Sequence, residues 1–313
     1  MLRAFRLLLV TFWPTLSSRL RRGPLRPSWP FLFEWLVRHV RRDWDETASW
    51  PLPRQRANFA RKFYPKPHVR QVQVRPGVIA GVRVRHFIPP VPGTTRIVYF
   101  HGGSYVYGST DTSHAELCAH LALATSLEVV GVEYRLAPES PWPAQLEYAV
   151  GVCRELTGSP LVLAGDSAGG HLAVKTAQQM KVEALALISP WVDLEMRGHE
   201  YLETYDIGTC EVLRRQALAV AGALPVASLS LSKDPLGALP PTLVVAGGAE
   251  ALLDDITGFA GNLRADGVDC TLHVAEDMPH CPPLFEAFHP SARHSFDAVA
   301  DFVRSHAKGP ASL

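Results

Sequence analysis

The chain has 313 residues, of which 47% are hydrophobic and 19% are charged, and its formal net charge at pH 7 is +1. This balance is typical of a soluble globular protein that forms one large domain, or one domain with a small appended subdomain. A chain so close to neutral has no polyelectrolyte character, which excludes nucleic acid as an expected partner. Five widely spaced cysteines without a CxxC pair predict neither a disulfide framework nor a zinc site, and they favour a reducing, cytoplasmic compartment.

The N-terminal segment differs from the rest in charge. Residues 1–62 contain 13 Lys/Arg and 4 Asp/Glu, a net charge of +9, so the remainder carries −8. Apolar residues recur at helical spacing between Leu2 and Leu20 with arginines on the other face, which predicts an amphipathic helix. The apolar run is too short to span a bilayer and leads to no small-x-small cleavage site. Three interpretations stay open: a helix packed over the body, peripheral contact with a membrane, and a cleaved signal.

Strands and helices are expected to alternate along most of the chain. A second helix is predicted over 31–42, and valines that alternate with polar residues near positions 72–74 and 82–84 predict two antiparallel edge strands. Buried strands are expected over 96–100, 127–134, 161–164, 184–188, 242–246 and 269–274. Helices are expected over 113–124, 144–156, 211–223, 254–265, 292–306 and from 172 onward. This alternation predicts right-handed βαβ crossovers and a mostly parallel sheet covered by helices on both faces.

The strand at 161–164 runs into the sequence Gly165-Asp166-Ser167-Ala168-Gly169. A strand, Gly-x-Ser-x-Gly and a helix in this order are typical of a nucleophile elbow, which would hold Ser167 at the apex of a sharp turn. Serine needs a base to act as a nucleophile at neutral pH, and acyl transfer also needs donors for the developing oxyanion. We expect the backbone N–H groups of Gly102 and Gly103, directly after strand 96–100, and of Ala168 to be those donors.

Three motifs follow one another at characteristic spacing: His101-Gly102-Gly103-Ser104, the stretch 133–139 (EYRLAPE) and the stretch 165–170 (GDSAGG). With them the chain closely resembles the hormone-sensitive-lipase-like esterases, a branch of the α/β-hydrolase fold, from about residue 97 to about 302. The resemblance implies carboxylic-ester hydrolysis without metal or organic cofactor. It also implies a helical cap made of residues 1–65 and an insertion at about 195–233, over a catalytic domain at 66–313. Family members often dimerise, so a homodimer is left open.

The remaining triad members should follow Ser167 in the order acid, then histidine, each on a loop after a strand. The family has Asp-Pro-Leu-x-Asp at the acid position, and alignment on Leu252 and Asp254 puts Glu250 there. Asp254 is the rival, although a helix start also explains its carboxylate. The family's Met-Pro-His corresponds to residues 278–280, which makes His280 the base. Beside it, Cys281 is expected to be structural.

Three residues near the motifs are candidates for binding substrate. Ser104 replaces the family's third glycine, and it is expected either to hydrogen-bond in the alcohol pocket or to hold the loop. Tyr105 and Trp191 are predicted walls of the acyl pocket, although aromatic residues near strand ends often belong to the core. Together the motifs predict a serine carboxylesterase for short- to medium-chain acyl esters, acting through an acyl-enzyme. A receptor that binds without cleaving, and an amidase or peptidase on the same triad, stay open.

Overall fold

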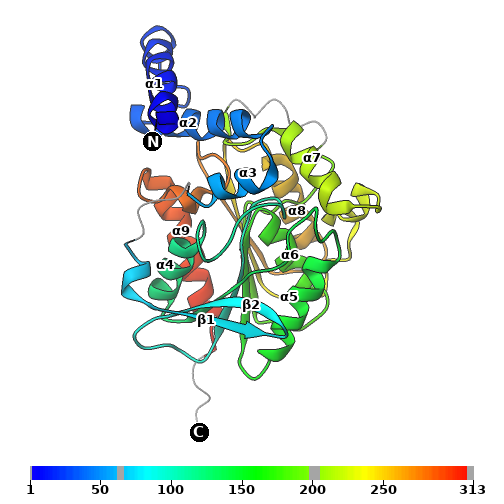
Figure 1. Ribbon diagram of the computed structural model, residues 1–313. Coiled ribbons are helices and arrows are strands. Elements are labelled where there is room, and N and C mark those ends of the chain that lie inside the picture. The colour runs from blue at the N-terminus through cyan, green and yellow to red at the C-terminus, as the bar shows by residue number, and fades with distance from the viewer. Residues whose placement is uncertain (1, 62–66, 197–204, 309–313) are drawn as a thin grey trace.

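An eight-stranded sheet forms the centre of the protein in this computed structural model, which describes residues 2–61, 67–196 and 205–308 (Figure 1). The strand order is β1-β2-β4-β3-β5-β6-β7-β8. The pairs β1–β2 and β2–β4 are antiparallel and all other pairs are parallel, which confirms the predicted sheet and its two antiparallel edge strands. The strands are β1 Gln73–Ile79, β2 Val82–Ile88, β3 Arg96–Phe100, β4 Glu128–Val132, β5 Leu161–Asp166, β6 Ala184–Ile188, β7 Thr242–Gly247 and β8 Cys270–Ala275.

Helices cover both faces of the sheet, as the alternating pattern predicts. Val98 and Phe100 of β3 face one hydrophobic cluster, which α5, α6 and α8 complete. Ile97 and Tyr99 of the same strand face the opposite cluster, formed with α4 and α9. Because helices bury both faces of the sheet, the central strands carry apolar side chains on both faces. The flanking helices are α4 Ala115–Thr125, α5 Ala144–Glu155, α6 Ala168–Ala177, α8 Leu253–Ala265 and α9 Pro290–His306.

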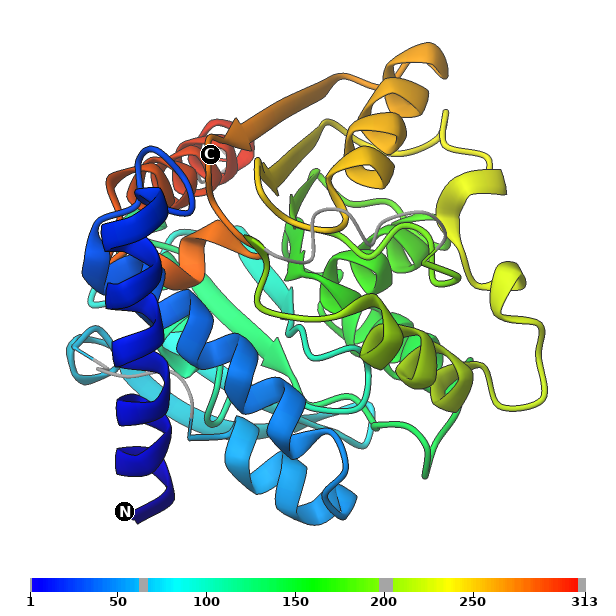
Figure 2. The same ribbon diagram turned by 90° about the horizontal axis from the view of Figure 1, so that it is seen from above.

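Three further helices lie over the carboxyl ends of the strands, α2 Phe31–Thr47, α3 Leu52–Phe59 and α7 Cys210–Ala221, and α1 Leu2–Arg22 lies on the outer side of α2 (Figures 1 and 2). The predicted N-terminal helix is therefore present. It packs on α2, where the ring of Phe12 contacts Phe31 and Trp35 edge-on and the Arg19 guanidinium pairs with Glu34 at 2.8 Å. Short 3-10 helices complete the chain: η1 Val69–Gln71, η3 Val226–Ser228, η4 Leu231–Lys233 and η5 Pro282–Phe285. Within the described part of the chain, no helix combines the length and apolar character that a membrane crossing requires.

The turn between β5 and α6 places Ser167 at its apex. Its backbone has φ 54° and ψ −119°, a conformation that is costly for a residue with a Cβ and that persists only where the surroundings enforce it. The turn is so tight that a Cβ on Gly169 would lie 1.9 Å from the carbonyl oxygen of Phe100. A Cβ on Gly165 would lie 2.5 Å from the carbonyl carbon of Gly169. Glycine is therefore needed on both sides of the serine.

Substituting Gly169→Ala is expected to lower the free energy of unfolding by about 3 kcal/mol. The new methyl group would overlap the Phe100 carbonyl, which cannot move without distorting β3. Urea unfolding followed by circular dichroism measures the effect. The matched control is Gly258→Ala on α8, where a Cβ meets nothing within 4 Å and where alanine should add about 0.5–1 kcal/mol. An unchanged midpoint for Gly169→Ala would contradict the prediction.

Candidate active site

Ser167 is anchored through its backbone to the end of β6 and to the loop that follows this strand. Its N–H donates to the carbonyl of Ile188 at 2.8 Å, and its own carbonyl accepts from the N–H of Trp191 at 3.0 Å and of His171 at 3.1 Å. These bonds hold the strained turn in place. The serine side chain lines a pocket at the carboxyl ends of the strands, and His280 lines the same pocket.

His280 and Glu250 form a hydrogen-bonded pair. The Nδ1 atom of His280 lies 2.5 Å from Oε2 of Glu250, whose side chain is fully buried. The second oxygen of Glu250 accepts from the N–H of Gly247 at 2.6 Å and from the hydroxyl of Ser189 at 2.9 Å. Asp254, the rival in sequence, is exposed in the first turn of α8. The structure thus brings Glu250, and not Asp254, to the imidazole.

The pair favours a charged imidazole. Burial raises the pKa of Glu250, and His280 opposes that rise. Burial alone would lower the pKa of His280, but Cys281 and Glu250 outweigh it and raise this pKa well above its ordinary value. Because burial raises the pKa of Cys281 to about 12, its thiol is neutral at pH 7 and the Glu250 carboxylate supplies the charge. A neutral, buried thiol is also a poor nucleophile, which agrees with a structural role for Cys281.

Asp206 joins the two loops that carry this pair. Its carboxylate accepts from the backbone N–H of His280 at 2.9 Å and from that of Ala251 at 2.8 Å. It therefore holds the histidine loop and the acid loop at a fixed separation. Sequence reasoning missed Asp206, because it lies in a segment without strand signal, far along the chain from both loops. The number of residues between Asp206 and either loop follows no pattern that would predict the contact.

The loop after β3 is held by Asp166, the residue before the nucleophile. The buried carboxylate accepts from the N–H of Gly102 at 2.9 Å and from the hydroxyl of Tyr99 at 2.7 Å, and His114 Nε2 lies 3.1 Å from its other oxygen. Burial by itself would raise the pKa of Asp166, but His114 and Tyr99 outweigh burial and lower this pKa below its ordinary value. An ionised Asp166 is thus a brace between the loop and the elbow.

This brace corrects one prediction. The N–H of Gly102 is committed to the Asp166 carboxylate, so Gly102 does not offer the oxyanion donor expected of it. Gly103 and Ser104 do line the pocket with Ser167, and both have positive φ, 116° and 52°. Ala168 is the first residue of α6, where backbone N–H groups have no partner within the helix.

The two predicted aromatic walls lie elsewhere. Tyr105 is fully buried and its hydroxyl lies 2.5 Å from Nδ1 of His171. Trp191 is also fully buried and its indole N–H donates to the sulfur of Met196. Neither residue lines the pocket. Both predictions are wrong, because each polar tip finds a partner inside the core and the rings fill space there.

The pocket wall is mostly apolar, and helices above the sheet contribute part of it. The pocket encloses about 720 Å³, including its open mouth. Trp44 of α2 and Phe59 of α3 contribute from the N-terminal segment, and Val212 and Leu213 contribute from α7. Figure 2 shows these helices over the carboxyl ends of the strands. An apolar pocket with a serine and a histidine in it suits a ligand with a hydrocarbon portion.

A comparison with protein families identifies the family of this chain. A family model described as alpha/beta hydrolase fold matches residues 97–283, more than half of the chain. The chain belongs to this family. Relatives include an esterase of Acinetobacter venetianus, 28% identical over 75% of this chain and 82% of that protein. An acetyl-hydrolase of Streptomyces hygroscopicus is 33% identical over 67% of this chain and 75% of that protein.

Solved structures of α/β-hydrolases agree with the family assignment. A crystal structure of an esterase from the bacterial hormone-sensitive lipase family superposes with a TM-score of 0.80 at 30% identity, covering 87% of this chain and 98% of that one. A mutant of the esterase E40 gives a TM-score of 0.81 at 30% identity over 86% and 96% of the two chains. The resemblance to hormone-sensitive-lipase-like esterases is thus confirmed. The protein is an ester hydrolase of the α/β-hydrolase fold.

Proposed function

We propose that the protein is a serine carboxylesterase whose triad is Ser167, His280 and Glu250. The observation that carries the proposal is the 2.5 Å contact between Nδ1 of His280 and the buried Glu250 carboxylate, in the pocket that Ser167 also lines. A base that is oriented by an acid and stands beside a serine is the arrangement that activates a hydroxyl for acyl transfer.

In this mechanism, Oγ of Ser167 attacks the ester carbonyl carbon while Nε2 of His280 takes its proton. The negative charge that develops on the carbonyl oxygen is held by the N–H groups of Gly103, Ser104 and Ala168. The imidazolium then protonates the leaving alcohol, and an acyl-enzyme remains. Water repeats the sequence through the same base, releasing the acid and free Ser167. Glu250 holds the imidazole with its proton on Nδ1 and stabilises the imidazolium.

The proposed substrates are esters of short- to medium-chain acids. Support comes from the apolar pocket wall, to which Trp44 and Phe59 contribute, and from the acetyl-hydrolase and esterase names of the relatives. Hydrolysis rates on nitrophenyl acetate, butyrate, octanoate and palmitate, with nitroanilides as the amide series, test the proposal. We expect kcat/KM to be highest at butyrate or octanoate. Binding without turnover of any of these would favour a receptor, and faster anilide cleavage would favour an amidase.

We propose that residues 1–65 and the insertion at about 195–233 form a cap over the catalytic domain at 66–313. Two segments that are distant in sequence contribute to one pocket wall: Trp44 and Phe59 from the first, Val212 and Leu213 from the second. Part of the insertion, residues 197–204, lies outside the described residues. A cap built in this way would set the acyl-chain limit, because its side chains meet the substrate beyond the reacting carbonyl.

We further propose that α1 makes peripheral contact with an anionic membrane surface. The side of α1 away from α2 exposes large apolar side chains: Trp13 is 63% and Leu20 is 80% exposed. The same N-terminal segment carries the net charge of +9. Exposed apolar and aromatic residues on a basic helix are typical of helices that lie in the lipid interface.

Substituting Trp13→Ser together with Leu20→Ser is expected to abolish sedimentation with vesicles of phosphatidylglycerol and phosphatidylcholine, while hydrolysis of soluble nitrophenyl butyrate stays unchanged. The wild-type protein should sediment with these vesicles at low salt and less at high salt, because basic residues supply part of the attraction. Val91→Ser, which removes a residue 79% exposed outside α1, is the matched control. Equal sedimentation of all three proteins would refute the contact.

The compartment and the oligomeric state stay predictions. All five cysteines are free thiols, which supports a reducing, cytoplasmic setting, with membrane association through α1 added to it. Light scattering of the purified protein tests the homodimer that the family resemblance leaves open.

A further inference from the structure

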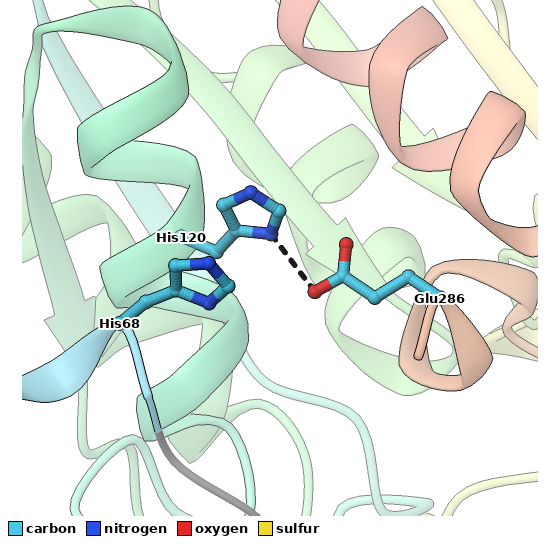
Figure 3. A group of neighbouring side chains, drawn as sticks. All are labelled: His68, His120 and Glu286. Atoms are coloured by element: carbon cyan, nitrogen blue, oxygen red, sulfur yellow. Dashed lines mark hydrogen bonds and ion pairs between the residues drawn. The ribbon is translucent and has the colours of Figure 1, made fainter. Parts of the chain in front are cut away.

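A group of polar side chains lies apart from the active-site pocket and has no part in the hydrolysis described above. His68 comes just before η1, His120 lies on α4, and Glu286 follows η5 (Figure 3). One nitrogen or oxygen of each residue lies within 4.8 Å of the corresponding atom of the other two. Their side chains are 26%, 23% and 19% exposed, so the group is reachable from solvent but largely enclosed.

A second carboxylate holds His68 in this position. Glu116, one helical turn before His120, lies 2.6 Å from Nδ1 of His68 and also accepts from the backbone N–H of His68 at 3.0 Å. With Nδ1 bound to Glu116, the free lone pair of this imidazole is on Nε2. A carboxylate behind a histidine in this way is the usual outer partner of a metal-binding imidazole, since it fixes the tautomer and raises ligand basicity.

The other two ligand atoms already face each other. Nδ1 of His120 lies 2.8 Å from Oε1 of Glu286, and Figure 3 shows the carboxylate directed at this ring. A hydrogen bond between an imidazole nitrogen and a carboxylate is a place where a metal ion can replace the shared proton. Both atoms then become ligands, and the imidazole is bound in its neutral form.

Binding an ion requires a small rearrangement of the rings. The imidazoles of His68 and His120 are stacked 3.8 Å apart and almost parallel, and Phe296 stacks on His120, also at 3.8 Å. Metal–nitrogen bonds of about 2.0–2.1 Å need ligand atoms that converge to roughly 3.3 Å of one another. Because Phe296 and His68 enclose His120 from both sides, we expect His68 to turn and Glu286 to move inward.

We propose that His68, His120 and Glu286 bind one divalent transition-metal ion of the Zn²⁺ class. Two imidazoles and one carboxylate suit such an ion and leave further positions to water. A cavity lined by His68, Glu116 and Glu286 adjoins the group and gives the ion an approach. The inference goes beyond the proposed ester hydrolysis, in which this ion takes no part.

The ion would act as a clamp on the fold. It would join three elements: η1 at the entry to the sheet, helix α4, and the segment that follows η5. The 3-10 helix η5 itself begins two residues after His280. A bound ion that stabilises only the folded state raises the unfolding temperature in proportion to the logarithm of its concentration once the site is saturated. The site would therefore couple stability of the histidine loop to metal supply.

Calorimetric titration of the untagged, chelator-washed protein with ZnCl₂ tests the proposal. We expect one ion to bind per chain, with affinity reduced at least 100-fold in both His68→Gln and Glu286→Gln. Glu116→Gln, which removes only the outer carboxylate, should weaken binding by about 10- to 100-fold. The matched control is His306→Gln at the end of α9, whose ring bonds within its own helix, and it should bind like wild type.

A second measurement separates binding from folding defects. The difference in unfolding temperature with and without ZnCl₂ is compared for each variant with itself, so a variant that is less stable without metal still gives a clear result. We expect a rise in the wild type and in His306→Gln and none in Glu286→Gln. No binding by the wild type, or binding that survives both His68→Gln and Glu286→Gln, would overturn the proposal.

Discussion

Substituting Ser167→Ala is expected to lower kcat for nitrophenyl butyrate by roughly 10⁶-fold, leaving only the rate that oxyanion donors and substrate positioning sustain. The hydroxyl is the group that forms the acyl-enzyme in the proposed mechanism, and the pocket offers no second activated nucleophile among the described residues that line it. Cys281, the only thiol among those lining residues, is neutral at pH 7 because burial raises its pKa to about 12.

The fold should survive this change. The backbone bonds that hold the elbow, from Ser167 N–H to Ile188 and from Trp191 N–H to Ser167, involve no side-chain atom. Unfolding in urea should therefore give the wild-type midpoint. Ser228→Ala, on an exposed 3-10 turn, is the control for loss of a hydroxyl and should keep full activity. If Ser167→Ala retained more than about 1% of wild-type kcat, the proposed nucleophile would be wrong.

The sheet and the elbow could be predicted because both are encoded locally. Each buried strand is a short apolar run, such as residues 184–188. The elbow has glycines at the two positions, 165 and 169, where a Cβ would overlap neighbouring backbone atoms. Ser167, Gly103 and His280 could also be placed in one site, since parallel strands bring their carboxyl ends to the same edge. For His280 the inference also needed the resemblance of residues 278–280 to the family's Met-Pro-His motif.

Features that depend on contacts between distant segments could not be predicted. Asp206 accepts hydrogen bonds from two loops, at positions 45 and 74 residues further along the chain. The hydrogen bond from the N–H of Gly102 to the Asp166 carboxylate could not be predicted either, because the motif gives no reason to distinguish Gly102 from Gly103. Tyr105 and Trp191 are predicted from their closeness in sequence to the motifs. Two aromatic residues that do line the pocket, Trp44 and Phe59, precede the nucleophile by more than 100 residues.

Glu250→Gln is expected to lower kcat by about 10⁴-fold with little effect on folding. In the wild type, the N–H of Gly247 and the hydroxyl of Ser189 both donate to one oxygen of Glu250. The glutamine carbonyl would keep those two bonds, which turns its amide NH₂ toward Nδ1 of His280. Nδ1 must then accept, so the ring proton moves to Nε2, the atom that has to take the proton of Ser167.

Asp254→Asn is the matched control for the loss of a carboxylate. Asp254 lies exposed on the first turn of α8. Loss of its interaction with the helix dipole should cost a few tenths of a kcal/mol in stability, with kcat unchanged. Steady-state kinetics of the two variants on one substrate decide between the acids. A large loss of kcat in Asp254→Asn and a small one in Glu250→Gln would reverse the assignment.

The pH dependence gives the same pair a second, independent test. His280 can take a proton only when neutral, and its pKa is raised well above 6.5 in spite of burial, by Cys281 and by the Glu250 carboxylate. The rate of the wild-type enzyme, as kcat/KM, should therefore rise with pH through a midpoint above 6.5. In Glu250→Gln the carboxylate charge is gone while burial remains, so the pKa of His280 falls and the midpoint of the residual activity moves to lower pH. A midpoint that stays in place would mean that another group controls the ionisation of the base.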